Sequence, residues 1–329
     1  MSDRLNLKSL DKYLVSKTLV NGTFKVKLAY DLETQRKVSA KICKTVQRKA
    51  ALQNEASVLN QLNHANIPNI IRIIDFIEND EPCCERPQFE EPESPTQFKP
   101  YRYRAALITE FTSNDSLFDF IFYNGAFDEK LSRTYLKQLL STLHQLHKLG
   151  YCHRNLNLEN LLLDSDFNLK LCGFEYAQKF SDPSKDFMTS KVGNEAYMAP
   201  EMHLGKGYSG VKVDIFSCGI ILFLMIFGKP PFFKANHKDP FYKYFVSGKP
   251  EKFWQIYEEK MNDGAEYNQD LKKLISSFLA FEPDDRPDLD RILQFDWLNG
   301  EVYNESELKE VMRLQKLHME LVAKKQKTA

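Results

Sequence analysis

The first third of the chain alternates between apolar and polar residues and is rich in β-branched side chains. This alternation predicts strands at "YLVSKTL", "KVKLAYD" and "KVSAKI", within residues 13–42, with a turn around "VNGTF" joining the first two. Apolar positions recur at helical spacing over residues 46–64, and further strands are predicted at 69–78 and 103–111. We therefore expect a small antiparallel sheet with one main helix.

Helical periodicity dominates the remainder of the chain. It predicts helices over residues 131–149, 213–227, 270–281 and 289–298. The longest apolar run, residues 218–227, has 10 residues, against the roughly 20 that a membrane span requires. It is therefore typical of a buried helix, and no membrane span is expected. The whole pattern predicts an α+β fold with a small β-rich lobe followed by a larger, mainly helical lobe.

Two segments fall outside these lobes. Residues 79–100 are rich in Pro and Glu, which predicts a disordered surface insertion. Residues 299–329 predict a helical extension with a capping-box signal near Ser306 and a basic end. Its apolar residues at one face would be Leu308, Val311, Leu314, Leu317 and Leu321. This face could pack on its own lobe, dock another protein, or associate with calmodulin or a membrane.

Composition and charge exclude several classes of partner. Lys plus Arg and Asp plus Glu number 45 each, so no net charge attracts nucleic acid or anionic lipid. The six cysteines lack C-x-x-C spacing, and the first residues lack the apolar core of a signal peptide. A reduced, cytoplasmic location is expected.

A series of motifs in order carries a family resemblance. "KVSAKI" precedes the helix that contains Glu55, and "HRNLNLEN" at 153–160 and "MAPE" at 198–201 follow. Asp214 in "VDIFSCG" and Arg286 in "DDRPD" complete the series. In this order the motifs resemble the protein kinase family over about residues 13–298. The resemblance is greatest to the calmodulin-dependent-kinase-like Ser/Thr group, and it implies lobes at 13–110 and 111–298.

The resemblance also implies a nucleotide site. Lys41 would be the phosphate-binding lysine and Glu55 its ion-pair partner, although either residue alone would be an ordinary surface charge. The backbone of Glu110 and Thr112 would meet the adenine edge. The remaining expected contacts are Val26, Ser39, Asn160 and Leu162. The phosphate-covering turn has only Gly22 of the usual three glycines, so weak ATP binding is expected.

The catalytic positions depart from the family pattern. Asn155 stands where the family has a proton-accepting Asp, and an amide cannot accept that proton. Asn157 replaces a lysine. Counting 13 residues from Asn160 places Gly173 at the metal-binding Asp, and Glu175 follows at the position of a glycine. Mg²⁺ binding is therefore not expected, with Asn160 as the only weak ligand and a small chance for Glu175.

These departures predict a pseudokinase that acts by binding, as a scaffold or allosteric regulator. Its partner would be a protein, such as an active kinase or a kinase substrate. Two alternatives stay open: a weakly active Ser/Thr kinase with an atypical site, and a nucleotide-responsive switch without turnover. Thr189 and Ser190 are candidate phosphosites whose phosphate Arg154 could bind. Arg154 could equally pair with an ordinary carboxylate.

Overall fold

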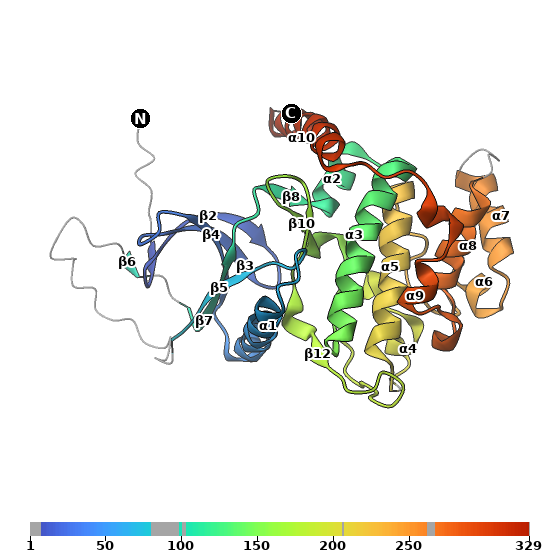
Figure 1. The fold of residues 1–329 in the computed structure, drawn as a ribbon, viewed down its shortest axis with the longest axis horizontal. Helices are drawn as coiled ribbons and strands as arrows, with labels where there is room; N and C mark the ends of the chain where they lie inside the picture. The colour runs from blue at the N-terminus through green and yellow to red at the C-terminus, as the bar shows by residue number, and fades with distance from the viewer. Residues whose placement is uncertain (1–7, 80–98, 101–102, 206, 262–266, 329) are drawn as a thin grey trace. The chain divides into compact units, whose positions relative to one another are not determined.

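The computed structural model describes residues 8–79, 99–100, 103–205, 207–261 and 267–328 (Figure 1). The chain forms two compact units. The first, here the small unit, comprises the described residues up to 67 together with 71–113, and the large unit comprises 68–70 and the described residues from 114 onward. A sheet dominates the small unit and helices dominate the large one, so the α+β prediction is confirmed.

The small unit is built on one sheet in the order β5-β7-β4-β3-β2-β1-β6. Its strands are β1 (Lys8–Leu10), β2 (Tyr13–Asn21), β3 (Lys25–Asp31), β4 (Lys37–Cys43), β5 (Ile73–Glu78), β6 (Lys99–Pro100) and β7 (Ala105–Glu110). Neighbouring strands are antiparallel except β1 and β6. Helix α1 (Val46–Ala65) packs against β4, β5 and β7 and buries Leu52 and Leu59. Period-two alternation thus produces the expected sheet and helix.

The strands at the β1 edge were not anticipated. β1 pairs with β2 and buries Leu10 completely, but three residues are too few to show a period. β6 falls within the predicted insertion and pairs in parallel with β1, so the prediction of no regular structure is wrong for Lys99–Pro100. The rest of that insertion, residues 80–98, lies outside the described residues.

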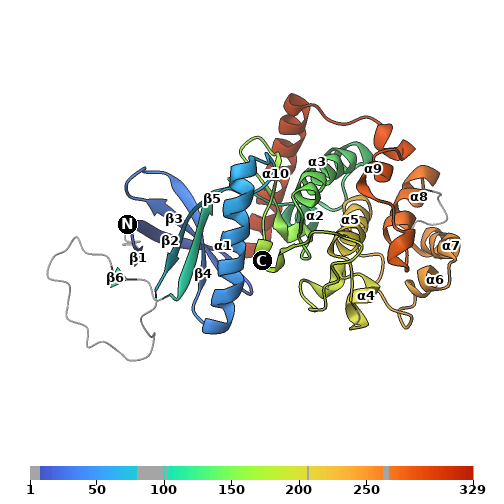
Figure 2. The ribbon, with the colours of Figure 1, turned by 60° about the horizontal axis from the view of Figure 1, so that its bottom comes forward.

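The large unit contains most of the helices (Figure 2). They are α2 (Leu117–Asn124), α3 (Glu129–Lys148), α4 (Pro200–His203), α5 (Gly210–Phe227), α6 (Lys243–Val246), α7 (Pro250–Met261), α8 (Gln269–Phe278), α9 (Leu289–Ile292) and α10 (Glu305–Thr328). Short strands β8 (Asn114–Ser116), β9 (Tyr151–Cys152), β10 (Leu161–Leu163), β11 (Leu169–Leu171) and β12 (Gln178–Lys179) frame its loops. Helix α5 alone among the described helices has the length and apolarity of a membrane span, yet 78% of it is buried inside the protein, as in a core helix.

Two helix predictions near the end of the large unit need correction. The helix expected over 289–298 is wrong: α9 ends at Ile292, and a 3₁₀ turn follows at Asp296–Asn299. From Gln294 onward the backbone N–H groups bond three residues back, which ends the α-helix. Helix α8 ends at Phe278 rather than 281, and beyond it the Arg286 guanidinium donates to the Ala280 carbonyl (3.0 Å) and the Phe281 carbonyl (3.2 Å).

The C-terminal helix forms as expected, but its orientation was predicted wrongly. Its capping box joins Asn304 and Glu307 rather than starting at Ser306. Of the predicted apolar face only Leu308 is buried; Val311 is half-buried, and Leu314, Leu317 and Leu321 are exposed. The buried face instead includes Met312 and Met319, which the leucine pattern had hidden.

Candidate nucleotide and catalytic sites

In the small unit, the predicted lysine and glutamate meet. The Lys41 Nζ atom of β4 lies 2.6 Å from the Glu55 Oε2 atom of α1, and the Glu55 side chain is only 3% exposed. Register places Val26 of β3 opposite Lys41, and Ser39 lies two residues before Lys41, so the three share one face of the sheet. The charge of Glu55 is compensated by its partner, as burial requires.

Sequence reasoning missed an aromatic neighbour of this pair. The Phe24 ring, 6% exposed, has its centre 4.6 Å from the Lys41 Nζ atom, a cation–π contact. Arg48 of α1 donates to the Thr23 carbonyl and so holds the turn down. The sequence signal that could have indicated this contact is Phe24 itself, a phenylalanine in a turn where the family pattern has glycines. The turn therefore covers the lysine with an aromatic ring where phosphate would approach.

Glu110, the first residue of the predicted adenine-edge segment, exchanges two hydrogen bonds with Arg72. The Glu110 N–H donates to the Arg72 carbonyl at 2.9 Å, and the Glu110 carboxylate accepts from the Arg72 N–H at 3.0 Å. Thr112 follows β7 and is half-buried. These contacts fix the backbone at the end of β7.

In the large unit, α5 holds the catalytic loop. The buried Asp214 carboxylate accepts from the backbone N–H groups of His153 (2.8 Å) and Arg154 (2.7 Å). Arg154 has a φ of 62°, in the left-handed region that is costly for this residue type. The hydrogen bonds to Asp214 offset that cost, and the His153 ring packs edge-on against Phe174 with centres 4.7 Å apart.

Three asparagines close the loop on itself. The Asn155 carbonyl accepts from the Asn157 Nδ2 atom at 3.0 Å and from the Asn160 Nδ2 atom at 2.8 Å. The Asn157 side-chain oxygen accepts from the Asn160 N–H at 2.9 Å and caps the 3₁₀ turn Leu158–Asn160. The loop's amides are thus used to hold its own backbone. Leu162, in β10, pairs with Ser116 of β8 directly after this loop.

A carboxylate lies beside the altered catalytic position. The Asn155 Nδ2 atom donates to the Glu175 Oε1 atom at 3.3 Å. Sequence reasoning gave Glu175 only a small role because its side chain starts from the motif's glycine position. The 3₁₀ turn Phe174–Tyr176 nevertheless directs this side chain to Asn155.

Gly173 and Asn160, the residues predicted to stand at the family's metal-ligand positions, lie next to each other. Gly173 has a φ of +82°, and a Cβ atom added there would come within 2.5 Å of the Asn160 amide atoms. Gly173 offers no ligand, and because the Asn160 Nδ2 atom donates to the Asn155 carbonyl, only the Asn160 Oδ1 atom is left as a single weak candidate ligand. In the part of the chain that the structure describes, no group of three or more His, Cys, Asp and Glu side chains could hold a metal. These residues do not fit a Mg²⁺ site.

The two candidate phosphosites differ in their surroundings. Thr189 and Ser190 are both exposed, but the Arg154 Nη1 atom lies 3.4 Å from the Ser190 hydroxyl. The Arg154 Nε atom donates to the Tyr176 carbonyl at 2.8 Å, which orients the guanidinium. Among the described contacts, this arginine reaches the Ser190 side chain and not that of Thr189.

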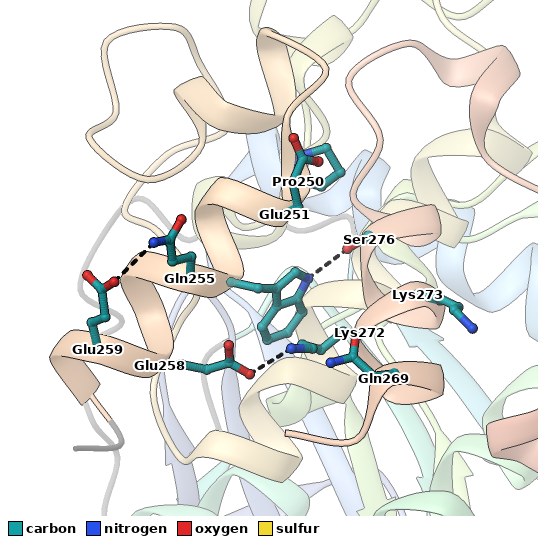
Figure 3. A pocket seen from close by; sticks show the side chains of 10 residues that line it. Pro250, Glu251, Gln255, Glu258, Glu259, Gln269, Lys272, Lys273 and Ser276 are labelled. Atoms are coloured by element: carbon teal, nitrogen blue, oxygen red, sulfur yellow. Dashed lines mark hydrogen bonds and ion pairs between the residues drawn. The ribbon is translucent and has the colours of Figure 1, made fainter. Parts of the chain in front are cut away.

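A hollow of about 450 Å³ lies elsewhere in the large unit, between α7 and α8 (Figure 3). The Trp254 Nε1 atom donates to the Ser276 hydroxyl at 2.8 Å, and Lys272 pairs with Glu258 at 2.7 Å. Its lining includes no residue of the catalytic loop. Its polar groups are paired with each other, so it does not extend the candidate catalytic site.

Comparison with known proteins agrees with the motif order. The family profile described as "Protein kinase domain" matches residues 13–298. A "Probable serine/threonine-protein kinase MARK-B" of Dictyostelium discoideum is 31% identical over 293 residues, covering 88% of this chain and 36% of that protein. "CBL-interacting serine/threonine-protein kinase 26" of Arabidopsis thaliana is 31% identical over 244 residues, covering 72% of this chain and 50% of that protein.

A third relative, "Probable serine/threonine-protein kinase MARK-A" of Dictyostelium discoideum, is 28% identical over 298 residues. The match covers 89% of this chain and 24% of that protein. The chain therefore spans between 24% and 50% of the length of these relatives. The likeness concerns the kinase domain that they share with this chain.

Proposed function

Since this chain belongs to the protein kinase family, whose members in general bind ATP and Mg²⁺, we propose that it is a pseudokinase that acts by binding another protein. The observation that carries this proposal is the asparagine loop. Asn155 is neutral, the Nδ2 atoms of Asn157 and Asn160 donate to its carbonyl, and Gly173 supplies no carboxylate. The loop keeps the family's backbone support from Asp214 without its acid–base group.

The size of the losses decides between weak and negligible transfer. Losing a general base costs about 10²- to 10⁴-fold in rate. Losing metal-assisted charge stabilisation costs several kcal/mol in addition. Starting from kinase turnovers of about 1–100 per second, even partly additive losses leave negligible phosphate transfer.

Phosphate incorporation from labelled ATP, with Mg²⁺ or Mn²⁺, tests this proposal. The unmodified chain and Asn155→Asp should both be inactive, since the base alone does not restore charge neutralisation. Asn155→Asp, Gly173→Asp and Glu175→Gly together should restore a low activity, provided that Asn160 rotates away from the new side chain. Transfer by the unmodified chain within tenfold of the triple variant would contradict the proposal.

Nucleotide binding can be tested separately by thermal melting. We expect ATP to raise the melting temperature little and Mg²⁺ to add almost nothing, because Phe24 covers Lys41 and Gly173 lacks a ligand. Phe24→Ala should increase the ATP-dependent shift by uncovering the ammonium group. A large Mg²⁺-dependent shift in the unmodified chain would instead favour the nucleotide-switch alternative.

The Glu175 contact favours one second candidate, a weakly active Ser/Thr kinase. Its carboxylate lies 3.3 Å from the Asn155 amide and could supply the negative charge that residue 155 lacks. Under this alternative, Glu175→Gln abolishes a measurable transfer that Asn155→Ala preserves. Under the pseudokinase proposal neither substitution changes a background rate.

The expected partner is a protein in the cytoplasm, such as an active kinase or its substrate. A phosphate on Ser190 would meet Arg154 and order the segment that carries it. Partner capture by the chain phosphorylated at Ser190, compared with Ser190→Ala, tests whether this modification regulates binding. Equal capture by both forms would exclude that role.

A further inference from the structure

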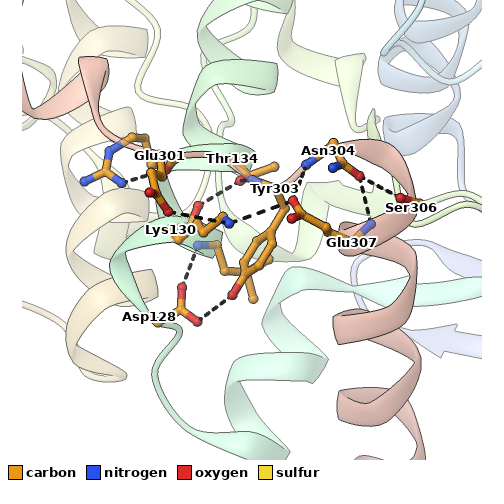
Figure 4. A network of polar contacts seen from close by, with 10 residues as sticks. Asp128, Lys130, Thr134, Glu301, Tyr303, Asn304, Ser306 and Glu307 are labelled. Atoms are coloured by element: carbon orange, nitrogen blue, oxygen red, sulfur yellow. Dashed lines mark hydrogen bonds and ion pairs between the residues drawn. The ribbon is translucent and has the colours of Figure 1, made fainter.

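The segment that precedes α10 is hydrogen-bonded to α3 and to Asp128, the residue directly before α3 (Figure 4). The Tyr303 N–H donates to the Thr134 hydroxyl at 2.9 Å, and the Tyr303 hydroxyl contacts the Asp128 carboxylate at 3.2 Å. Asn304 and Glu307 then form a capping box, at 3.0 and 2.9 Å, which starts the helix. The first turn of α10 is thereby fixed on the large unit.

Helix α10 packs against α2 through one face only. Leu308, Met312 and Met319 are buried on this face, and the Gln315 carbonyl accepts from the Asn124 side chain at 3.0 Å. Turning the helix to bury another face would give up these contacts. Packing within the large unit therefore determines that this face of α10 is the buried one.

The opposite face carries an exposed leucine stripe, defined as Leu314, Leu317 and Leu321. Their exposed fractions are 65%, 56% and 51%. At about 100° per residue, this stripe lies on the far side of α10 from Met312 and Met319. Three leucines at spacings of three and four residues form the apolar seam of a helix that pairs with another helix.

Charges are distributed unevenly along this stripe. Glu310 precedes it by about one turn and Lys324 follows it, both exposed and on the same side of the helix. Arg313 and Glu320 are exposed along one edge of the stripe. Along this face the charges therefore alternate in sign, acidic, basic, acidic and basic, with leucines between them.

We propose that α10 pairs with α10 of a second copy of this chain, antiparallel, with a two-fold axis near Leu317. This arrangement places Glu310 opposite Lys324 of the second copy, and Arg313 within one residue of the level of Glu320 of the second copy. Leu314 likewise lies within one residue of the level of Leu321, and Leu317 meets its own equivalent at the axis. A two-fold interface requires such self-complementarity.

The charge order selects this occupant over others. A parallel copy would place Glu310 against Glu310 and Lys324 against Lys324, which is repulsive. A uniformly basic or acidic helix would match only one end of the face. A helix with the same alternating charge order, run antiparallel, matches both ends and the leucines between them, and a second copy of this chain supplies it.

The contact is small, since residues 310–324 span only about 21 Å of helix. Interfaces of this kind lie at the low end of buried area and are transient. We therefore expect a monomer–dimer equilibrium that depends on concentration. This equilibrium does not depend on whether the chain transfers phosphate.

Sedimentation velocity over a concentration series tests the pairing. The unmodified chain should shift toward a dimer as concentration rises, and Leu317→Glu should stay monomeric with an unchanged melting temperature. Leu149→Glu is the matched control, because Leu149 is also an exposed leucine of the large unit, at 43%; it should dimerise normally. A monomer at every concentration, or equal association of Leu317→Glu, overturns the proposal.

Charge exchange tests the antiparallel order. Glu310→Lys and Lys324→Glu should each self-associate about tenfold more weakly, because two attractive pairs become repulsive in each homodimer. Mixed in equal amounts, the two variants should form a heterodimer of roughly the original strength, since both pairs are attractive again. A mixture that associates no better than either variant alone overturns the antiparallel arrangement.

Discussion

Arg286 and Asn155 both lie in the large unit, but Arg286 keeps the charged residue of the family motif and Asn155 does not. Arg286 is 1% exposed and makes a bidentate ion pair with Glu201 at 2.6 and 2.8 Å. Asn155, at the family's catalytic carboxylate, is a neutral amide bonded to neighbouring amides and Glu175. In the large unit, charges that support the fold match the family motif, whereas the catalytic-loop and metal positions carry no carboxylate. The pseudokinase proposal depends on this difference.

The largest expected effect comes from breaking the structural pair. Glu201→Ala leaves the Arg286 charge buried without its partner, which should lower the free energy of unfolding by about 3–5 kcal/mol. Urea unfolding measures this loss. Lys185→Ala is the control, because its pair with Asp182 is exposed and should contribute less than about 1 kcal/mol. Equal losses of unfolding free energy in the two variants would show that the buried ion pair contributes no more to stability than the exposed one.

The next effect concerns the support of the catalytic loop. Asp214→Ala leaves the N–H groups of His153 and Arg154 without their acceptor, and should cost about 2–4 kcal/mol. Asp214→Asn retains one oxygen and should lose roughly half as much. Hydrogen exchange at the two amides should accelerate in the same order. Unchanged exchange would show that the loop does not depend on α5.

Much of this architecture could be predicted because it depends on local pattern. Period-two alternation gave β2, β3, β4 and β7 within two residues or fewer, and motif order gave the family. The two strands at the sheet edge were missed because three-residue and two-residue pairings carry no period. The helix expected over 289–298 failed because carbonyl contacts and 3₁₀ turns, rather than apolar spacing, determine that segment.

The candidate site was predictable by position but not by side-chain direction. Counting assigned Gly173 and Glu175 to the motif, but the Glu175 contact with Asn155 depends on the 3₁₀ turn that carries Glu175. Phe24 is a similar case, since its packing over Lys41 depends on how the shortened turn folds. On α10, leucine spacing could not reveal that the methionine face is the docked one.

A smaller effect should follow when a carboxylate is returned to the catalytic loop. Asn155→Asp places two carboxylates within about 3 Å and should lower stability at neutral pH by about 1 kcal/mol, because like charges raise the shared pKa. This loss is complete above the raised folded pKa and disappears as pH falls below the unfolded pKa. Asn155→Asp with Glu175→Gln should show no such loss. Equal stability of both variants would mean that Glu175 turns away.

The smallest expected effect tests whether the region of the Arg286–Glu201 ion pair loses stability in acid. His203 lies in α4 beside Glu201, and its two ring nitrogens are buried without a hydrogen-bond partner among the described residues. Burial lowers its pKa, and Lys234 and Lys191 lower it further against the opposing effect of Glu195 and Glu201.

Because the folded His203 pKa lies below the unfolded value of about 6.5, the unfolded chain binds this proton more readily. Its contribution to stability is present at neutral pH and should decline as pH falls from about 6.5 toward the folded pKa. His203→Leu should remove this part of the pH dependence in urea unfolding, whereas His237→Leu, at an exposed position, should keep it. If the two variants respond alike, His203 binds its proton equally well in the folded and unfolded states and does not make stability depend on pH.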